Sequence, residues 1–143
     1  MDEELTGQDK KLVAYLLSQD RVRLAYRFGS LVAGRAGPLS DVDLGVLLDE
    51  SLNKLERFKL HLKLLDDLTS ILGTDRIDLV IMNNAPLSLT FEIIKSNYPL
   101  LVRDRSEKIA FEHGVLSRYL DRRYYETRWT AAYLRRVAEG GVW

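Results

Sequence analysis

Two short apolar segments on either side of a glycine-rich stretch constrain the fold of this 143-residue chain more than any other feature. Residues 22–28 alternate between larger apolar side chains and mostly polar ones, which is typical of a strand with one buried face. Residues 42–48 are apolar apart from one aspartate and one glycine, as expected of a strand inside a sheet. The intervening residues 29–40 are rich in glycine and small residues and include Gly37-Pro38, so they contain a loop.

Helical and extended patterns alternate along the rest of the chain. Helices are expected over residues 8–19, 53–72, 86–97 and 106–137, and two further strands over residues 76–82 and 100–102. This order predicts an α/β (α+β) fold in which helices flank a small mixed sheet. We expect residues 1–104 to form the main domain and residues 105–143 a C-terminal helical extension packed on it.

Local signals refine three of these helices. Asn53 and Glu56 have the spacing of a capping box, and Gly73 is a suitable stop for the same helix. Thr6 or Asp9 could cap the first helix, and Gly114 could interrupt the last. The core-facing stripe of the helix over residues 53–72 is predicted to consist of Leu55, Phe58, Leu62, Leu65, Leu68 and Leu72.

The composition excludes several classes of protein. The chain has no cysteine, so a disulfide framework, a thiol nucleophile and a cysteine-based zinc site are ruled out. With only His61 and His113 as imidazoles, any metal must be held by oxygen, which favours magnesium. Basic and acidic residues both number 21, so net charge does not favour nucleic acid. The polar first residues and the lack of an apolar run of about 18 residues indicate a soluble cytoplasmic protein with no membrane partner.

Three aspartates are candidate metal ligands. Asp41 and Asp43 lie two residues apart at the start of a strand, so their side chains project from the same face. Two carboxylates that close repel one another unless a cation lies between them. Asp78 lies in the apolar segment RIDLVIM, where an ionised carboxylate requires a partner. A neighbouring strand that places Asp78 beside the other two would complete a site for a hard divalent cation.

Gly29 and Ser30 are candidate phosphate ligands, because glycine lets a phosphate approach the backbone and the serine hydroxyl donates a hydrogen bond. Each feature also has a plain structural interpretation. Gly29-Ser30 could be an ordinary turn, the two aspartates could be a solvated strand end, and Asp78 could pair with Arg76 or Arg27.

The combination is more specific than its parts. Gly29-Ser30 is followed by ten residues, then by Asp41-Val42-Asp43, and Asp78 follows on a later strand. This pattern resembles the nucleotidyltransferase superfamily typified by DNA polymerase β. The resemblance covers residues 28–48 and extends more weakly through Asp78 and into LLVRD at residues 100–104. It implies the polymerase β-like nucleotidyltransferase fold, and Gly34 and Ser40 match positions common in small members.

The short chain is similar to the minimal nucleotidyltransferases (MNT), the antitoxins of HEPN–MNT toxin–antitoxin systems. That resemblance implies transfer of AMP from ATP to a tyrosine hydroxyl of a HEPN RNase toxin. It implies that Asp41 and Asp43 bind two Mg²⁺ ions, that Asp78 binds one of them and helps to activate the acceptor, and that Gly29 and Ser30 hold the triphosphate. Small members often carry a basic residue before the loop glycine, where this chain has Ala33; Arg35 could substitute for it.

Two other functions remain open from the sequence. The chain could neutralise a partner by contact alone, with its carboxylates a relic, or it could transfer the nucleotide to a different hydroxyl acceptor. The C-terminal helix bears on the first of these, because its aromatic and arginine residues are types enriched in protein interfaces. The residues that we expect to contact a HEPN partner are Tyr119, Tyr124, Tyr125, Trp129, Arg122 and Arg123.

The same helix has two further interpretations. It could be an ordinary amphipathic helix whose Leu116, Leu120 and Leu134 pack on the sheet while the arginines are solvated. Arginines interleaved with aromatic rings could also bind RNA by charge and stacking, which we consider the weakest of the three interpretations.

Overall fold

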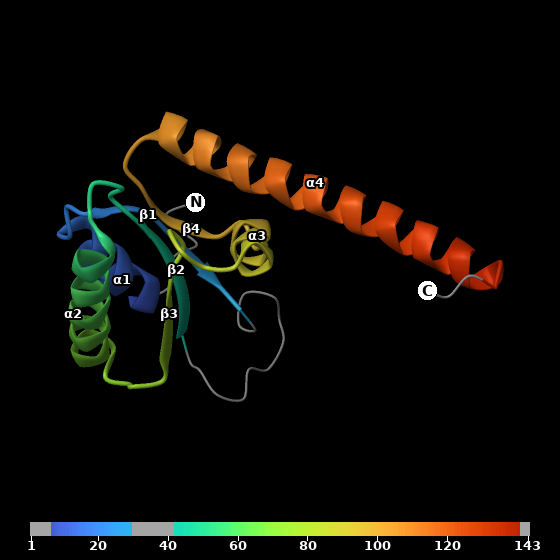
Figure 1. Cartoon of the computed structure of the whole chain (residues 1–143). Coiled ribbons are helices and arrows are strands. Elements are labelled where there is room, and N and C mark those ends of the chain that lie inside the picture. The colour runs from blue at the N-terminus through green and yellow to red at the C-terminus, as the bar shows by residue number, and fades with distance from the viewer. Residues whose placement is uncertain (1–6, 30–41, 141–143) are drawn as a thin grey trace.

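The computed structural model describes residues 7–29 and 42–140, which form one four-stranded mixed sheet with helices on both faces (Figure 1). The strands are β1 (Val22–Phe28), β2 (Val42–Leu48), β3 (Ile77–Ile81) and β4 (Pro99–Val102). Their order across the sheet is β3-β2-β1-β4. β1 is antiparallel to β2 and β4, whereas β2 and β3 are parallel. The predicted fold class is therefore confirmed.

The helices divide between the two faces of the sheet. They are α1 (Gly7–Leu17), α2 (Lys54–Leu72), α3 (Leu87–Lys95) and α4 (Arg105–Ala138). α1 and α2 lie on one side of the sheet and α3 and α4 on the other (Figure 1). Each face has its own apolar core: Leu12, Leu16, Leu64 and Leu68 belong to the first. Tyr26, Met82 and Ile93 belong to the second.

The strong local signals of α2 are confirmed, but its predicted core stripe is correct only in the second half of the helix, where Leu68 is buried and Leu65 and Leu72 pack against the core. Asn53 and Glu56 form the capping box, and Gly73 ends the helix in a left-handed conformation. The residues fully buried on the sheet are Leu64 and Leu68, whereas Leu55, Phe58 and Leu62 are 60%, 57% and 51% exposed. Leucines lie on more than one side of this helix, so a spacing of three and four fits two different faces.

α4 is a single helix of 34 residues, so the interruption considered at Gly114 does not occur. Three polar or aromatic contacts help to hold its first half, in which Val115 is also buried. Glu107 pairs with Arg23 at 3.0 Å, Glu112 accepts a hydrogen bond from the Tyr26 hydroxyl, and the Tyr119 ring stacks on Phe91 with centroids 3.8 Å apart. These contacts fix the helix against β1 and α3.

The second half of α4 extends beyond α3 into open space (Figure 1). The interpretation in which leucines of α4 pack on the sheet is wrong, because Leu116, Leu120 and Leu134 are 44%, 54% and 58% exposed. None of the helices in the described ranges combines the length and apolar character that a bilayer crossing requires.

Candidate functional site

Asp43 and Asp78 lie directly opposite one another on neighbouring parallel strands. Phe28, the last residue of β1, is paired with Asp43 on the other side of β2. Residues paired across strands point to the same face of the sheet. Two residues further along each strand, Tyr26, Gly45 and Val80 are paired in the same way, and they lie on the face covered by α3. The two carboxylates therefore share the α3 face, at the end of the sheet where β1 finishes and where β2 and β3 begin.

The electrostatics of this pair differ between its two members. The Asp43 residue is only 8% exposed, whereas Asp78 is exposed at the edge strand. Partial burial and then the negative charge of Asp43 raise the pKa of Asp78, and His61 opposes that shift. A carboxyl whose pKa is raised by a neighbouring carboxylate is in a place where a cation would be bound favourably.

Gly29 lies against the same carboxylate. Its φ of +93° is in the region that favours glycine. A Cβ atom added there would lie 2.0 Å from Asp43 Oδ2 and 3.0 Å from Asp43 Cβ. Both the backbone conformation and the close approach therefore require glycine, and the end of β1 is brought up to the Asp43 side chain.

A buried ion pair lies on the opposite face of the sheet, behind this corner. Arg27 Nη1 lies 2.6 Å from Asp9 Oδ1, and the Tyr98 hydroxyl donates to Asp9 Oδ2. Asp9 is therefore not a helix cap facing solvent, and Arg27 does not pair with Asp78. The alternating pattern of β1 assigned Arg27 to a polar face, yet the residue is only 6% exposed. The sequence carries no local signal for a pair that joins α1 to β1.

Several predicted site residues are outside the described ranges: Ser30, Gly34, Arg35, Ser40 and Asp41, together with Ala33. Within residues 7–29 and 42–140, no three metal-ligating side chains form a cluster that could hold an ion. Asp43 and Asp78 nevertheless fit a hard divalent cation, since they supply two carboxylates on one face with mutual repulsion to relieve.

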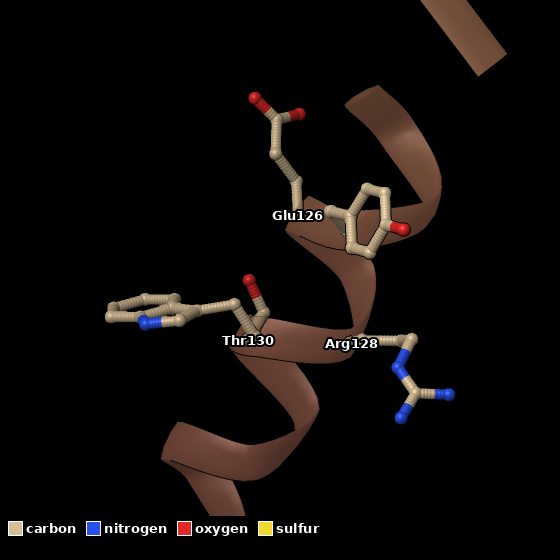
Figure 2. Close-up of a pocket in the computed structure, with 5 residues that line it drawn as sticks. Glu126, Arg128 and Thr130 are labelled. Carbon is tan, nitrogen blue, oxygen red and sulfur yellow. The ribbon is translucent and has the colours of Figure 1, made fainter. Parts of the chain in front are cut away.

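A separate hollow of about 790 Å³ lies on α4 and is lined by Tyr125, Glu126, Arg128, Trp129 and Thr130. All five residues come from one stretch of helix, and Figure 2 shows Glu126 and Thr130 projecting to one side of it and Arg128 to another. A hollow with walls from a single exposed helix does not enclose a small molecule. We therefore do not assign the nucleotide to it.

Comparison with known proteins identifies the family. Residues 10–106 match the model described as Polymerase beta, Nucleotidyltransferase. The chain belongs to this nucleotidyltransferase family. The family and the enzyme class predicted from the Gly-Ser and Asp-x-Asp motifs are thereby confirmed. A comparison with curated proteins finds no significant match.

Solved structures of toxin–antitoxin complexes contain chains with the same fold as this nucleotidyltransferase. In a toxin–antitoxin complex with AMP-PNP, the similar chain is 24% identical with a TM-score of 0.61, over 88% of this chain and 98% of that chain. In the toxin–antitoxin MntA-HepT, the similar chain is 22% identical with a TM-score of 0.61, and the match covers 89% of this chain and 97% of that chain. In the complex of the tri-AMPylated Shewanella oneidensis HEPN toxin with MNT antitoxin, the similar chain is 22% identical with a TM-score of 0.59. That match covers 89% of this chain and 96% of that chain. At these identities the likeness shows the fold.

Proposed function

We propose that this nucleotidyltransferase is a magnesium-dependent antitoxin that transfers AMP from ATP to a tyrosine hydroxyl of a partner HEPN RNase toxin. The observation that carries the proposal is the pairing of Asp43 with Asp78 beside the close approach of Gly29. Two of the similar solved structures support the choice of nucleotide and acceptor, since one contains AMP-PNP and another an AMPylated HEPN toxin. We also propose a cytoplasmic location, where ATP is available for this reaction.

The proposed roles are those that the resemblance to minimal nucleotidyltransferases implies, and Asp43, Asp78 and Gly29 lie where these roles need them. Asp41 and Asp43 would hold two Mg²⁺ ions, and Asp78 would hold one of them and help to activate the acceptor hydroxyl. Magnesium, when bound, neutralises charge on the triphosphate and on the attacking oxygen. Gly29 and Ser30 would hold the triphosphate, because the absence of a side chain at position 29 leaves the backbone N–H groups accessible.

Further contacts to the triphosphate are proposed from the loop. Gly34 and Ser40 would shape the loop around the phosphates. Arg35 would supply the positive charge that small members of the family often carry at the position of Ala33.

The bond changes of the proposed step balance without another reactant. The tyrosine oxygen forms a bond to the α-phosphorus of ATP, and the bond from that phosphorus to the bridging oxygen breaks. Pyrophosphate leaves with the electron pair, and the hydroxyl proton passes to a base at the site. Alignment of the attacking oxygen with the leaving group is the main contribution that the protein can make to such a step.

The second half of α4 is proposed as the contact surface for the HEPN partner. Tyr124, Tyr125 and Trp129 are 55%, 68% and 68% exposed, so three large rings are available for burial. Tyr119 stacks on Phe91, which leaves it at the base of this surface. Arg122 and Arg123 line a hollow of about 450 Å³ beside Tyr119 and would supply charged contacts. Exposed aromatic residues and arginines of this kind contribute most to binding when they become buried.

The test begins with a search of the adjacent reading frames for a HEPN-domain protein, and that protein is then combined with the chain. Incubation with labelled ATP and Mg²⁺ is expected to label the HEPN protein at tyrosine, as mass spectrometry would show. Asp41→Asn with Asp43→Asn should abolish the label, whereas Asp75→Asn, at an exposed position before β3, should not. Labelling that survives the double substitution, or that never occurs with the wild type, contradicts the proposal.

A non-catalytic antitoxin is the second candidate, and the exposed rings on α4 favour it. If contact alone neutralises the toxin, the double asparagine variant will protect cells as well as the wild type at the same expression level. If transfer is needed, protection is lost although the two proteins still bind. An acceptor other than the HEPN protein would be recognised by label on a small molecule or on RNA in the same reaction.

A further inference from the structure

The buried ion pair behind the site satisfies both oxygens of one carboxylate. Arg27 Nη1 donates to Asp9 Oδ1 at 2.6 Å, and the Tyr98 hydroxyl donates to Oδ2. Asp9 has no exposed surface and Arg27 is 6% exposed. Removing two charges from water costs desolvation free energy, so each charge requires a partner with good geometry. The three side chains therefore have one well-defined arrangement, which joins α1, β1 and the segment before β4.

The backbone of Arg27 is held by the same surroundings. Its N–H donates to the Tyr98 carbonyl at 2.9 Å, and its carbonyl accepts from Ser96 Oγ at 3.0 Å. Asn97, between these two partners, has a φ of +54°, which asparagine tolerates better than most residues. Side chain, N–H and carbonyl of one residue are thus fixed two positions before Gly29.

We propose that Asp9, Arg27 and Tyr98 are positioning residues for the nucleotide site. They act through the end of β1, which carries Gly29 to the carboxylate of Asp43 on the opposite face of the sheet. The clearance there is small, since a Cβ atom on Gly29 would lie 2.0 Å from Asp43 Oδ2. A shift of about 1 Å at such a corner is enough to lower activity by about 100-fold. The inference rests on the proposed binding of the triphosphate at Gly29.

A purely structural role makes a different prediction. Replacing a buried ion pair with apolar side chains of similar size often leaves stability unchanged or raises it. The triple variant Asp9→Leu, Arg27→Met and Tyr98→Phe removes the two charges and the hydroxyl of these three side chains together. If the network only stabilises the fold, a folded triple variant binds nucleotide normally. If it positions Gly29, the variant folds and binds nucleotide poorly.

The experiment measures the dissociation constant of a non-hydrolysable ATP analogue with Mg²⁺ by calorimetry, on full-length chains well below their thermal unfolding midpoints. The triple variant is expected to bind about tenfold more weakly than the wild type, because the end of β1 is no longer pre-organised. The matched control is Arg23→Met, which removes an ion pair with Glu107 at the other end of β1. It should bind as tightly as the wild type.

The outcomes are separable. A folded triple variant with wild-type affinity overturns the inference and leaves the proposed function intact. If the triple variant does not unfold cooperatively, the same measurement is made on the single variant Tyr98→Phe. Binding about threefold weaker than that of the wild type supports the inference, and unchanged binding overturns it. The binding experiment uses no acceptor, so its result does not depend on the HEPN protein. If the wild type binds nucleotide here but labels no HEPN protein in the transfer assay, only the proposed acceptor is overturned. A wild type that binds no nucleotide overturns both.

Discussion

Replacing Asp78 by asparagine is expected to stabilise the metal-free protein. Asp43 and Asp78 are register partners on parallel strands, so two negative charges face the same side of the sheet. Asparagine keeps the size of the side chain and removes one of the charges. Most substitutions destabilise a protein, so a gain in stability would be a specific sign of repulsion at this site.

The magnitude follows from the strand spacing. Paired residues on neighbouring strands lie about 5 Å apart, and two unit charges at that distance repel by about 3 kcal/mol at an effective dielectric constant of about 20. In bulk water the figure falls to about 0.8 kcal/mol. Since Asp43 is 8% exposed but Asp78 is exposed, a value near the lower figure applies. A gain of about 1 kcal/mol corresponds to a rise of about 3 °C in the unfolding midpoint for a chain of this length.

The assay is thermal unfolding at neutral pH, first in chelator and then with Mg²⁺. In chelator, Asp78→Asn should unfold about 3 °C above the wild type, and Asp75→Asn should match the wild type. Mg²⁺ should raise the midpoint of the wild type more than that of Asp78→Asn, because a bound ion stabilises only the folded state that holds it. A variant that unfolds below the wild type in chelator, with an equal response to Mg²⁺, would refute the reasoning.

Three further predictions use other parts of the structure. Gly29→Ala should lower the free energy of unfolding by about 1–2 kcal/mol and weaken binding of the ATP analogue. The control is Gly73→Ala, because Gly73 also has a positive φ but has open space around it. This substitution should lower the free energy of unfolding by about 1 kcal/mol and leave nucleotide binding unchanged. The Tyr15 hydroxyl of α1 donates a hydrogen bond to the Asp67 carboxylate of α2, which lowers the pKa of Asp67. This carboxylate therefore contributes stability above its unfolded pKa of about 3.9, and that stability is lost as the pH falls through its folded pKa. Asp67→Asn should therefore flatten the acid limb of the unfolding midpoint below about pH 4, and a limb as steep as that of the wild type would count against the pair. Trp129→Ala should weaken HEPN binding by more than about 1 kcal/mol with unchanged nucleotide affinity, as surface plasmon resonance and calorimetry would show. Equal HEPN affinity would contradict the proposed contact of Trp129 with the partner.

The parts of the fold that the sequence predicts are those with local causes. The capping box of Asn53 and Glu56 and the stop at Gly73 involve neighbouring residues, so α2 could be bounded within one residue of its observed start. The aspartate of an otherwise apolar segment indicated Asp78, and the structure places it opposite Asp43. The catalytic and metal-binding roles of these residues stay a prediction.

The parts that the sequence does not predict depend on distant contacts. Asp9 and Arg27 are 18 residues apart and meet only because α1 packs beside the end of β1. Gly114 does not interrupt α4, because one glycine costs only about 1 kcal/mol relative to alanine and the contact of Glu112 with Tyr26 lies next to it. The buried face of α2 is decided by where the sheet lies rather than by the spacing of its leucines.

The most direct test of the central claim is a crystal structure of the chain with an ATP analogue and Mn²⁺ in place of Mg²⁺, read by the anomalous signal of the metal. We expect a metal peak between the carboxylates of Asp43 and Asp78, with the triphosphate against Gly29. A nucleotide bound away from Gly29, or a metal peak that neither aspartate contacts, would contradict the account.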